Sequence, residues 1–350
     1  MNLAITEFLK QTEAIKIHNE CFESFERLLK AHKKTEPDAR KIANNFTAER
    51  IFNYRANIIS LYGCFEHFIE ALIKEYIGDL SQICKSFDKL DKKIRRGYVV
   101  NWKTLHGKLS FPKYSDISEK EMIESLYLSI VEGHNKIMEE CYLKNGGNYN
   151  HRMVMDSFCE LGLDNLDTIL GKYHPLNEFL QQEGLQDMES ESKYRMLNSL
   201  VQYRNNIAHG VDPDNILSVH EFTDYLDFLE KYAKAVALYV NDSYWGKYWE
   251  IKAKDKVLKP DKVYPKIGVA EFTIANVILY QGQKIIMKQA EGNYPRYKDF
   301  VLPNIFKVKK TDWDNSKITD VKELCEDGIW KVSIKIDIKC NDRCRFYFCD

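Results

Sequence analysis

Residues 203–210, with the sequence Tyr-Arg-Asn-Asn-Ile-Ala-His-Gly, combine side chains that act on phosphodiesters. Arg204 carries a planar cation whose N–H donors match phosphate oxygens, and the His209 imidazole exchanges protons near neutral pH. Asn205 lies four residues before His209, so the two share one face of a helix. We therefore take Arg204, Asn205 and His209 as candidate catalytic residues, and the adjacent Asn206 as a candidate substrate-binding residue.

A helix is predicted to position these residues. Arg204 interrupts its apolar stripe, where burial of an unpaired guanidinium would be costly. Gly210 and Pro213 are predicted to end the helix immediately after His209, which gives a helix over about 190–209. The stripe recurs at three- and four-residue spacing and consists of Leu197, Leu200, Val201, Ile207, Ala208 and Val211.

The same Arg-x4-His spacing occurs a second time, from Arg27 to His32. That copy has no polar residue after the Arg and runs into Lys33 and Lys34, which is typical of a solvated helix face. For the copy at Arg204 one plain alternative stays open, a helix-capping His beside a structural Arg.

The Arg-Asn-x3-His motif resembles the Arg-polar-x3-His signature of the HEPN superfamily, the higher eukaryotes and prokaryotes nucleotide-binding domains. Residues 60–69 are similar to the first core helix of its prokaryotic RiboL-PSP-like branch, where a Glu recurs in a small-x-x-Glu-aromatic setting that Glu66 matches. Residues 145–148, Asn-Gly-Gly-Asn, and the helical stretch 153–162 resemble the same branch. The resemblance covers about residues 45–245.

This resemblance implies a metal-independent endoribonuclease without a cofactor, in which a ribose 2′-OH attacks the adjacent phosphodiester and leaves a 2′,3′-cyclic phosphate. His209 would act as general base or acid, Arg204 would stabilise the phosphorane-like transition state, and Asn205 would orient the imidazole or the phosphate. Glu66 and Asn206 are the expected substrate-binding residues, although Glu66 is equally explained as a helix-surface carboxylate.

The superfamily pattern further implies a homodimer, in which the motif helices of two protomers build one composite site. The expected partners are RNA and a regulatory protein, and the expected setting is toxin or antiphage defence. Because some members have lost activity, a non-catalytic nucleotide- or RNA-binding module, an adaptor or an antitoxin, is the alternative. A third reading is a structural dimerisation protein in which Arg204 and His209 pair across an interface.

Composition indicates an ordinary soluble protein of two domains, with 350 residues, 44% of them hydrophobic and 29% charged. The net charge of −1 gives no overall attraction for nucleic acid, although residues 254–350 carry 19 basic against 14 acidic residues. No apolar run approaches the length of a membrane span, and the N-terminus lacks a signal-peptide pattern. Nine cysteines, an odd number, favour a reducing cytoplasm over a disulfide framework.

We predict an α+β protein, a mainly α-helical HEPN-like bundle over residues 1–253 followed by a small β barrel or sandwich over residues 254–350. The bundle is expected to carry an irregular helical insertion at about 83–190 in its 45–245 core. Thr47 is the expected N-cap of the second helix. The helices are expected over about 3–32, 47–77, 118–144, 151–162, 190–209 and 218–241.

The cysteines near the C-terminus are the candidate ligands for a metal ion in this sequence. Cys340, Cys344 and Cys349, with Cys325 upstream, carry thiols that ligate zinc in other proteins. Their spacing fits no standard knuckle, and alternation over 332–348 instead predicts a β-hairpin with small core cysteines. We therefore predict no metal site.

Overall fold

A computed structural model describes most of the chain. It divides into two compact units, Met1–Val240 and Asn241–Asp350. The first is helical and the strands lie in the second, which confirms the α+β class. None of the described helices is long and apolar enough to cross a membrane. The described residues are 3–144, 148–211, 216–253, 257–275, 279–280, 282–289, 296–301, 306–310, 319–321, 323–324, 329–336 and 340–349.

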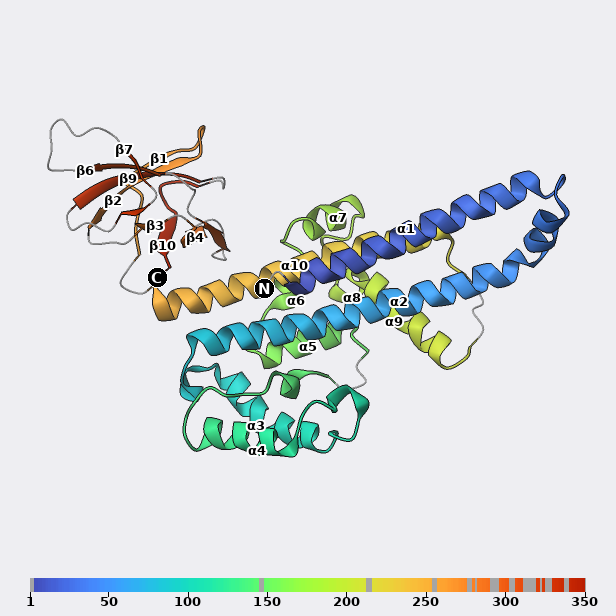
Figure 1. The fold of residues 1–350 in the computed structure, drawn as a ribbon, viewed down its shortest axis with the longest axis horizontal. Coiled ribbons are helices and arrows are strands. Elements are labelled where there is room, and N and C mark those ends of the chain that lie inside the picture. The colour runs from blue at the N-terminus through green and yellow to red at the C-terminus, as the bar shows by residue number, and fades with distance from the viewer. Residues whose placement is uncertain are drawn as a thin grey trace. The chain divides into compact units, whose positions relative to one another are not determined.

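Two long helices, α1 (Leu3–His32) and α2 (Pro37–Ile83), form an antiparallel pair (Figure 1). The ring centroids of Phe8 and Phe68 lie 5.2 Å apart between them. The buried face of α2 repeats every three or four residues, as a helix against a core requires. It includes Tyr54, Ile58, Leu61, Phe65, Phe68, Leu72 and Tyr76.

The predicted start of α2 at Thr47 is wrong, because the helix begins ten residues earlier, at Pro37. Proline suits a first helical turn, where its missing N–H would have no intrahelical partner. The connection between α1 and α2 is therefore only the short segment between His32 and Pro37, and Thr47 lies inside α2. A Thr with helical neighbours on both sides is no cap.

Short helices occupy the segment between α2 and the motif. The helix expected over 118–144 stops at Ile130, and Gly133 beyond it has a left-handed φ of 71° that a helix cannot continue through. The helix expected over 151–162 is present as α5. The elements are η1 (Phe87–Lys89), α3 (Lys92–His106), η2 (Pro112–Tyr114), α4 (Glu119–Ile130), η3 (Glu139–Tyr142), α5 (His151–Glu160), α6 (Leu166–Leu170), α7 (Leu176–Gln182) and α8 (Ser190–Lys193).

The motif helix is α9 (Arg195–Ala208), and α10 (Val219–Lys252) follows it. The expected 190–209 helix is interrupted at Tyr194, which separates α8 from α9. The helix expected to end near residue 241 continues to Lys252 as α10. Its aromatic residues 244, 245, 248 and 249 recur at three- and four-residue spacing, which places them on one face of the helix.

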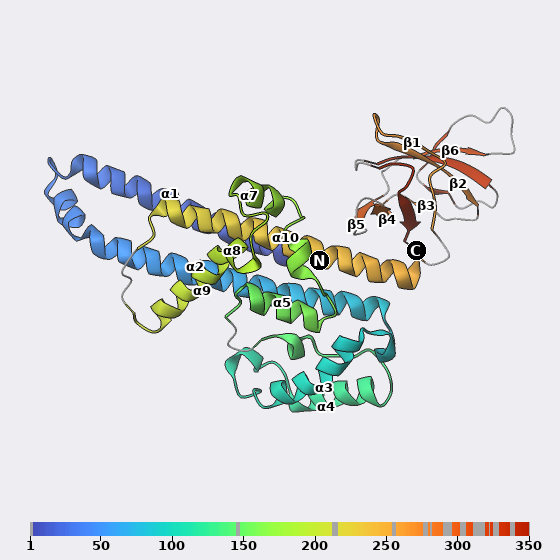
Figure 2. The ribbon, with the colours of Figure 1, turned by 180° about the vertical axis from the view of Figure 1, so that it is seen from behind.

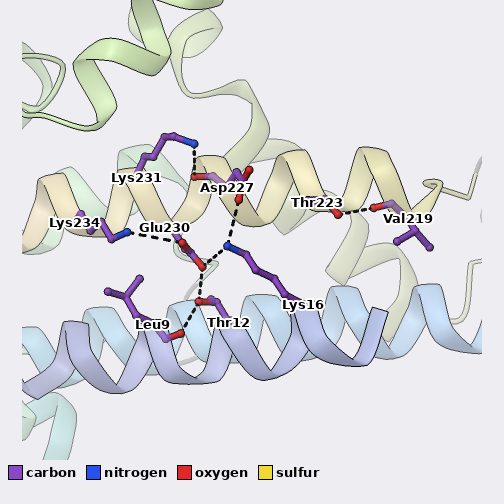
Figure 3. A network of polar contacts seen from close by, with 9 residues as sticks. All are labelled: Leu9, Thr12, Lys16, Val219, Thr223, Asp227, Glu230, Lys231 and Lys234. Carbon is purple, nitrogen blue, oxygen red and sulfur yellow. Dashed lines mark hydrogen bonds and ion pairs between the residues drawn. The ribbon is translucent and has the colours of Figure 1, made fainter. Parts of the chain in front are cut away.

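Polar contacts join α10 to α1 in the first unit (Figure 3). Lys16 Nζ lies 2.9 Å from a carboxylate oxygen of Glu230 and 3.3 Å from one of Asp227. The Thr12 hydroxyl donates to the same Glu230 carboxylate at 2.8 Å. Both ribbon views show α10 running along α1 here (Figures 1 and 2).

The second unit holds antiparallel strands in three sheets of order β1-β2-β9-β6-β7, β10-β4-β5 and β3-β8. The described strands do not close into a barrel. The two larger sheets share one core, as in a sandwich. The ring centroids of Phe272 from one sheet and Phe346 from the other lie 5.0 Å apart in it. The strands are β1 (Lys262–Tyr264), β2 (Val269–Ala275), β3 (Leu279–Tyr280), β4 (Lys284–Gln289), β5 (Arg296–Val301), β6 (Phe306–Lys310), β7 (Thr319–Val321), β8 (Glu323–Leu324), β9 (Ile329–Lys335) and β10 (Arg345–Phe348).

The expected C-terminal hairpin is also wrong, because β10 pairs with β4 while β9 lies between β2 and β6. Alternation in sequence shows which residues face inward but not which strand is the neighbour. Cys340, Cys344 and Cys349 are buried and form no disulfide, and Cys325 lies outside the described residues. No three His, Cys, Asp or Glu side chains of the described residues gather as metal ligands.

Candidate functional site

The motif lies where α9 ends. His209 is the C-cap residue, and its backbone N–H donates to the Asn205 carbonyl at 3.0 Å, which keeps it one helical turn after Asn205. Gly210 then adopts a φ of 71°, and the N–H groups of Gly210 and Val211 turn back to α9 carbonyls at 3.1 and 2.9 Å. The predicted termination at Gly210 is confirmed, whereas Pro213 lies outside the described residues.

Arg204 rests on an aromatic ring of α2. Its guanidinium carbon lies 4.2 Å from the ring centroid of Tyr62, a cation–π contact that is worth up to about 2 kcal/mol when desolvated. Arg204 is half-buried, and its Nε is buried without a hydrogen-bond partner among the described residues. The ring thus provides the favourable contact that makes this cation tolerable on an apolar stripe, and it fixes the plane of the guanidinium.

Tyr62 is itself held in place. Its hydroxyl accepts the backbone N–H of Tyr149 at 2.9 Å. Burial raises the pKa of Tyr62, the charge of Glu66 adds to the rise, and the Tyr149 N–H and Arg204 oppose it. Sequence reasoning missed both tyrosines as site residues. A signal for Tyr62 existed, because it precedes Glu66 by four residues and so shares its helix face.

Glu66 is half-buried on α2, beside the same cation. Burial raises the pKa of Glu66, the nearby Glu70 carboxylate adds to the rise, and the charges of Arg204 and Lys113 lower it. Lys113 forms an ion pair with Glu70. The structure therefore places a carboxylate and a guanidinium from separate helices in one electrostatic neighbourhood.

The remaining motif residues differ in their surroundings. Asn206 accepts a hydrogen bond from Gln202 at 2.8 Å, within α9 itself. The His209 side chain is exposed and makes no hydrogen bond or ion pair with the described residues. Val211 is 51% exposed and Ala208 is exposed. The last turn of the apolar stripe is therefore exposed, although the sequence predicted that it would be buried. Spacing identifies an apolar face but not how far the neighbouring helix covers it.

A buried histidine that sequence reasoning missed supports α9 from the side. His151 lies 3.0 Å from a carboxylate oxygen of Asp167 and 2.8 Å from the hydroxyl of Tyr232, and its ring stacks on Tyr194 at 3.8 Å. Burial lowers the pKa of His151, while Asp167 opposes that shift. The backbone N–H of His151 donates to Asn198 of α9 at 3.2 Å. This cluster anchors the motif helix at its other end.

The structure thus provides an oriented guanidinium on α9, a half-buried carboxylate near it on α2, and an exposed imidazole where α9 ends. Comparison with curated proteins gives no match. Comparison with family models matches residues 19–242, more than half of the chain, to the family described as RiboL-PSP-HEPN. That family supports a HEPN-type nuclease or nucleotide-binding module in general. The match spans α2 and α9, the helices that carry the motif, and the chain belongs to the RiboL-PSP-HEPN family.

Proposed function

We propose that this protein is a metal-independent endoribonuclease. The observation that carries the proposal is the fixed guanidinium of Arg204 on Tyr62, five residues before an exposed imidazole at His209. A planar cation with a set orientation is suited to an anionic transition state, because its donors need no reorganisation when charge develops. An imidazole in contact with solvent is suited to moving protons.

In the proposed reaction the ribose O2′ attacks the adjacent phosphorus and the bond to O5′ breaks. One general base takes the proton from the 2′-OH, and one general acid protonates the departing O5′, so the products are a 2′,3′-cyclic phosphate and a 5′-hydroxyl. His209 supplies the proton transfer and Arg204 neutralises the phosphorane oxygens. Asn205 orients the imidazole or the phosphate, and Asn206 and Glu66 contact the substrate. Glu66, an anion, is suited to a ribose hydroxyl rather than to the phosphate.

A single imidazole cannot be base and acid in the same step, so we propose that a second copy of the chain contributes the other. Exposed apolar side chains on α2 and after α9 offer surface that such a dimer would cover. Phe52 and Ile59 of α2 are 71% and 43% exposed, and Val211 after α9 is 51% exposed. Toxin or antiphage defence, with a regulatory protein partner, is the biological setting we propose for such an enzyme.

The test is cleavage of a mixed RNA pool by the full chain in excess EDTA, with analysis of the product ends. We expect cyclic-phosphate ends from the wild-type protein and a loss of about 10²- to 10⁴-fold in rate for His209→Ala. The matched control is His32→Ala, which removes the imidazole of the other Arg-x4-His spacing, exposed at the end of α1. Cleavage that stops in EDTA and returns with magnesium would point to a different centre, and intact RNA binding without cleavage would favour the non-catalytic module.

A further inference from the structure

A cavity of about 440 Å³ lies in the first unit between α1, α2 and the beginning of α10. This volume is within the range of about 300–1,000 Å³ usual for small-molecule sites. The cavity is separate from the Arg204 contact, because Tyr54 in its wall precedes Tyr62 by eight residues, about 12 Å along α2. Its lining includes Phe22, Asn53, Tyr54, Asn57, Ser218 and Phe222.

Buried amides form its polar wall. Asn53 and Asn57 are 7% and 6% exposed, and both line the cavity. Asn57 donates its amide N–H to the side-chain oxygen of Asn19 at 2.6 Å, and Asn53 bonds to His18 at 2.8 Å. The Asn19 amide nitrogen behind them is buried without a partner among the described residues. Buried amides with unused capacity are costly unless a bound molecule satisfies them.

Two further polar atoms in the wall remain available. Asn57 and Tyr54 line the cavity, and the Asn57 carbonyl oxygen and the Tyr54 hydroxyl make no hydrogen bond with the part of the chain that the structure describes. Burial raises the pKa of Tyr54, with the charge of Tyr203 adding to the rise, so this hydroxyl stays protonated and able to donate. The wall thus offers one acceptor and one donor.

The rest of the lining includes aromatic rings and charged side chains that are paired with one another. Phe22, Tyr54 and Phe222 supply three rings around the amides. At the rim Glu26 forms ion pairs with Arg50 and with Lys30, so the described lining residues leave no unpaired cation to hold a phosphate. Rings that stack and amides that pair edge to edge are the means by which proteins bind unstacked bases.

We propose that this cavity binds a nucleobase, with adenine preferred because its amino group can donate to the Asn57 carbonyl while a ring nitrogen accepts from the Tyr54 hydroxyl. The inference rests on the proposed ribonuclease function for the source of the base, a nucleotide of the substrate strand near the cut. Tyr54 in the cavity wall lies on α2, the same helix that presents Tyr62 to Arg204 of the motif helix. A base held in the cavity would therefore lie along the helix that carries the Arg204 contact.

The first measurement is calorimetric titration of the full-length His209→Ala variant, which cleaves nothing under the proposal, with adenosine, guanosine, cytidine, uridine and adenosine monophosphate. We expect adenosine to bind most tightly and the monophosphate to bind no better than adenosine, since the described rim residues leave no unpaired cation. Asn57→Leu introduces a side chain of similar size that cannot form hydrogen bonds, and it should weaken the binding of adenosine at least tenfold. Thr47→Trp, which obstructs the exposed rim without removing a buried contact, should do the same.

The matched control is Asn45→Leu, an exposed asparagine of the same helix outside the cavity, which should leave binding unchanged. Absence of binding by all four nucleosides, or equal weakening by Asn45→Leu and Asn57→Leu, would overturn the proposal.

Cleavage assays then distinguish the source of the base. If it belongs to the substrate strand, Asn57→Leu should change the base preference beside the cut. If it is a free effector, added adenosine should change the wild-type rate and leave that preference intact. Adenosine binding by a wild-type chain that cleaves no RNA would remove the proposed ribonuclease function and leave the nucleobase site standing.

Discussion

Replacing Arg204 with Lys separates the two roles that its guanidinium combines. Lys keeps the positive charge near Glu66 but lacks the planar guanidinium, whose central carbon lies 4.2 Å from the centroid of the Tyr62 ring. A cation–π contact on a half-buried side chain is worth about 1 kcal/mol, so the free energy of unfolding should fall by about that amount. Because a domain is stable by about 5–15 kcal/mol, Arg204→Lys should remain folded.

The cleavage rate should fall much further. Loss of a preorganised pair of donors to the transition state costs about 2.7–4 kcal/mol, or about 10²- to 10³-fold in rate. The assay pairs urea denaturation with initial cleavage rates under single-turnover conditions. Tyr62→Phe is the control, since it keeps the ring and leaves the Tyr149 N–H unpaired, at about 1–3 kcal/mol of stability. We expect it to retain most of its activity. If Arg204→Lys cleaves within threefold of wild type, the guanidinium is structural and the reasoning is refuted.

Three further predictions concern the supports of the site. Burial lowers the pKa of His151 in the folded state, so below the ordinary pKa of 6.5 the unfolded chain binds more protons and stability falls with falling pH. Urea denaturation at pH 7.5 and 5.5 should show a smaller loss for His151→Phe than for wild type, and equal losses would contradict this. Gly210→Ala forces a side chain into a φ of 71° in open space, which should cost about 1 kcal/mol and reduce cleavage. Gly184→Ala, with a φ of 65° and equal space, should cost the same stability and spare cleavage, and parallel losses of activity would remove the link to the motif. Mixed Arg204→Ala and His209→Ala chains should regain partial activity, and light scattering should find dimers at concentrations where RNA is cut. A protein that cleaves while monomeric would rule out the shared site.

Local patterns in the sequence determined the motif helix and its end. The stripe of Leu197, Leu200 and Val201 is buried, and Gly210 ends the helix with positive φ, because both features depend on residues a few positions apart. The family resemblance, carried by short motifs, is confirmed over residues 19–242. The sequence determined the boundaries of the elements less well. Thr47 is a residue type suited to capping a helix, but α2 extends on both sides of it because packing stabilises the longer helix.

Only the tertiary structure decided what surrounds the catalytic candidates. Nothing near Arg204 in sequence indicates that its guanidinium lies on Tyr62, since the two are 142 positions apart on separate helices. The cluster of His151 with Asp167 and the amide-lined cavity likewise join segments that carry no local pattern in common. The physical reason is that periodicity specifies which face of an element is buried, whereas the identity of the partner depends on how all the elements pack together.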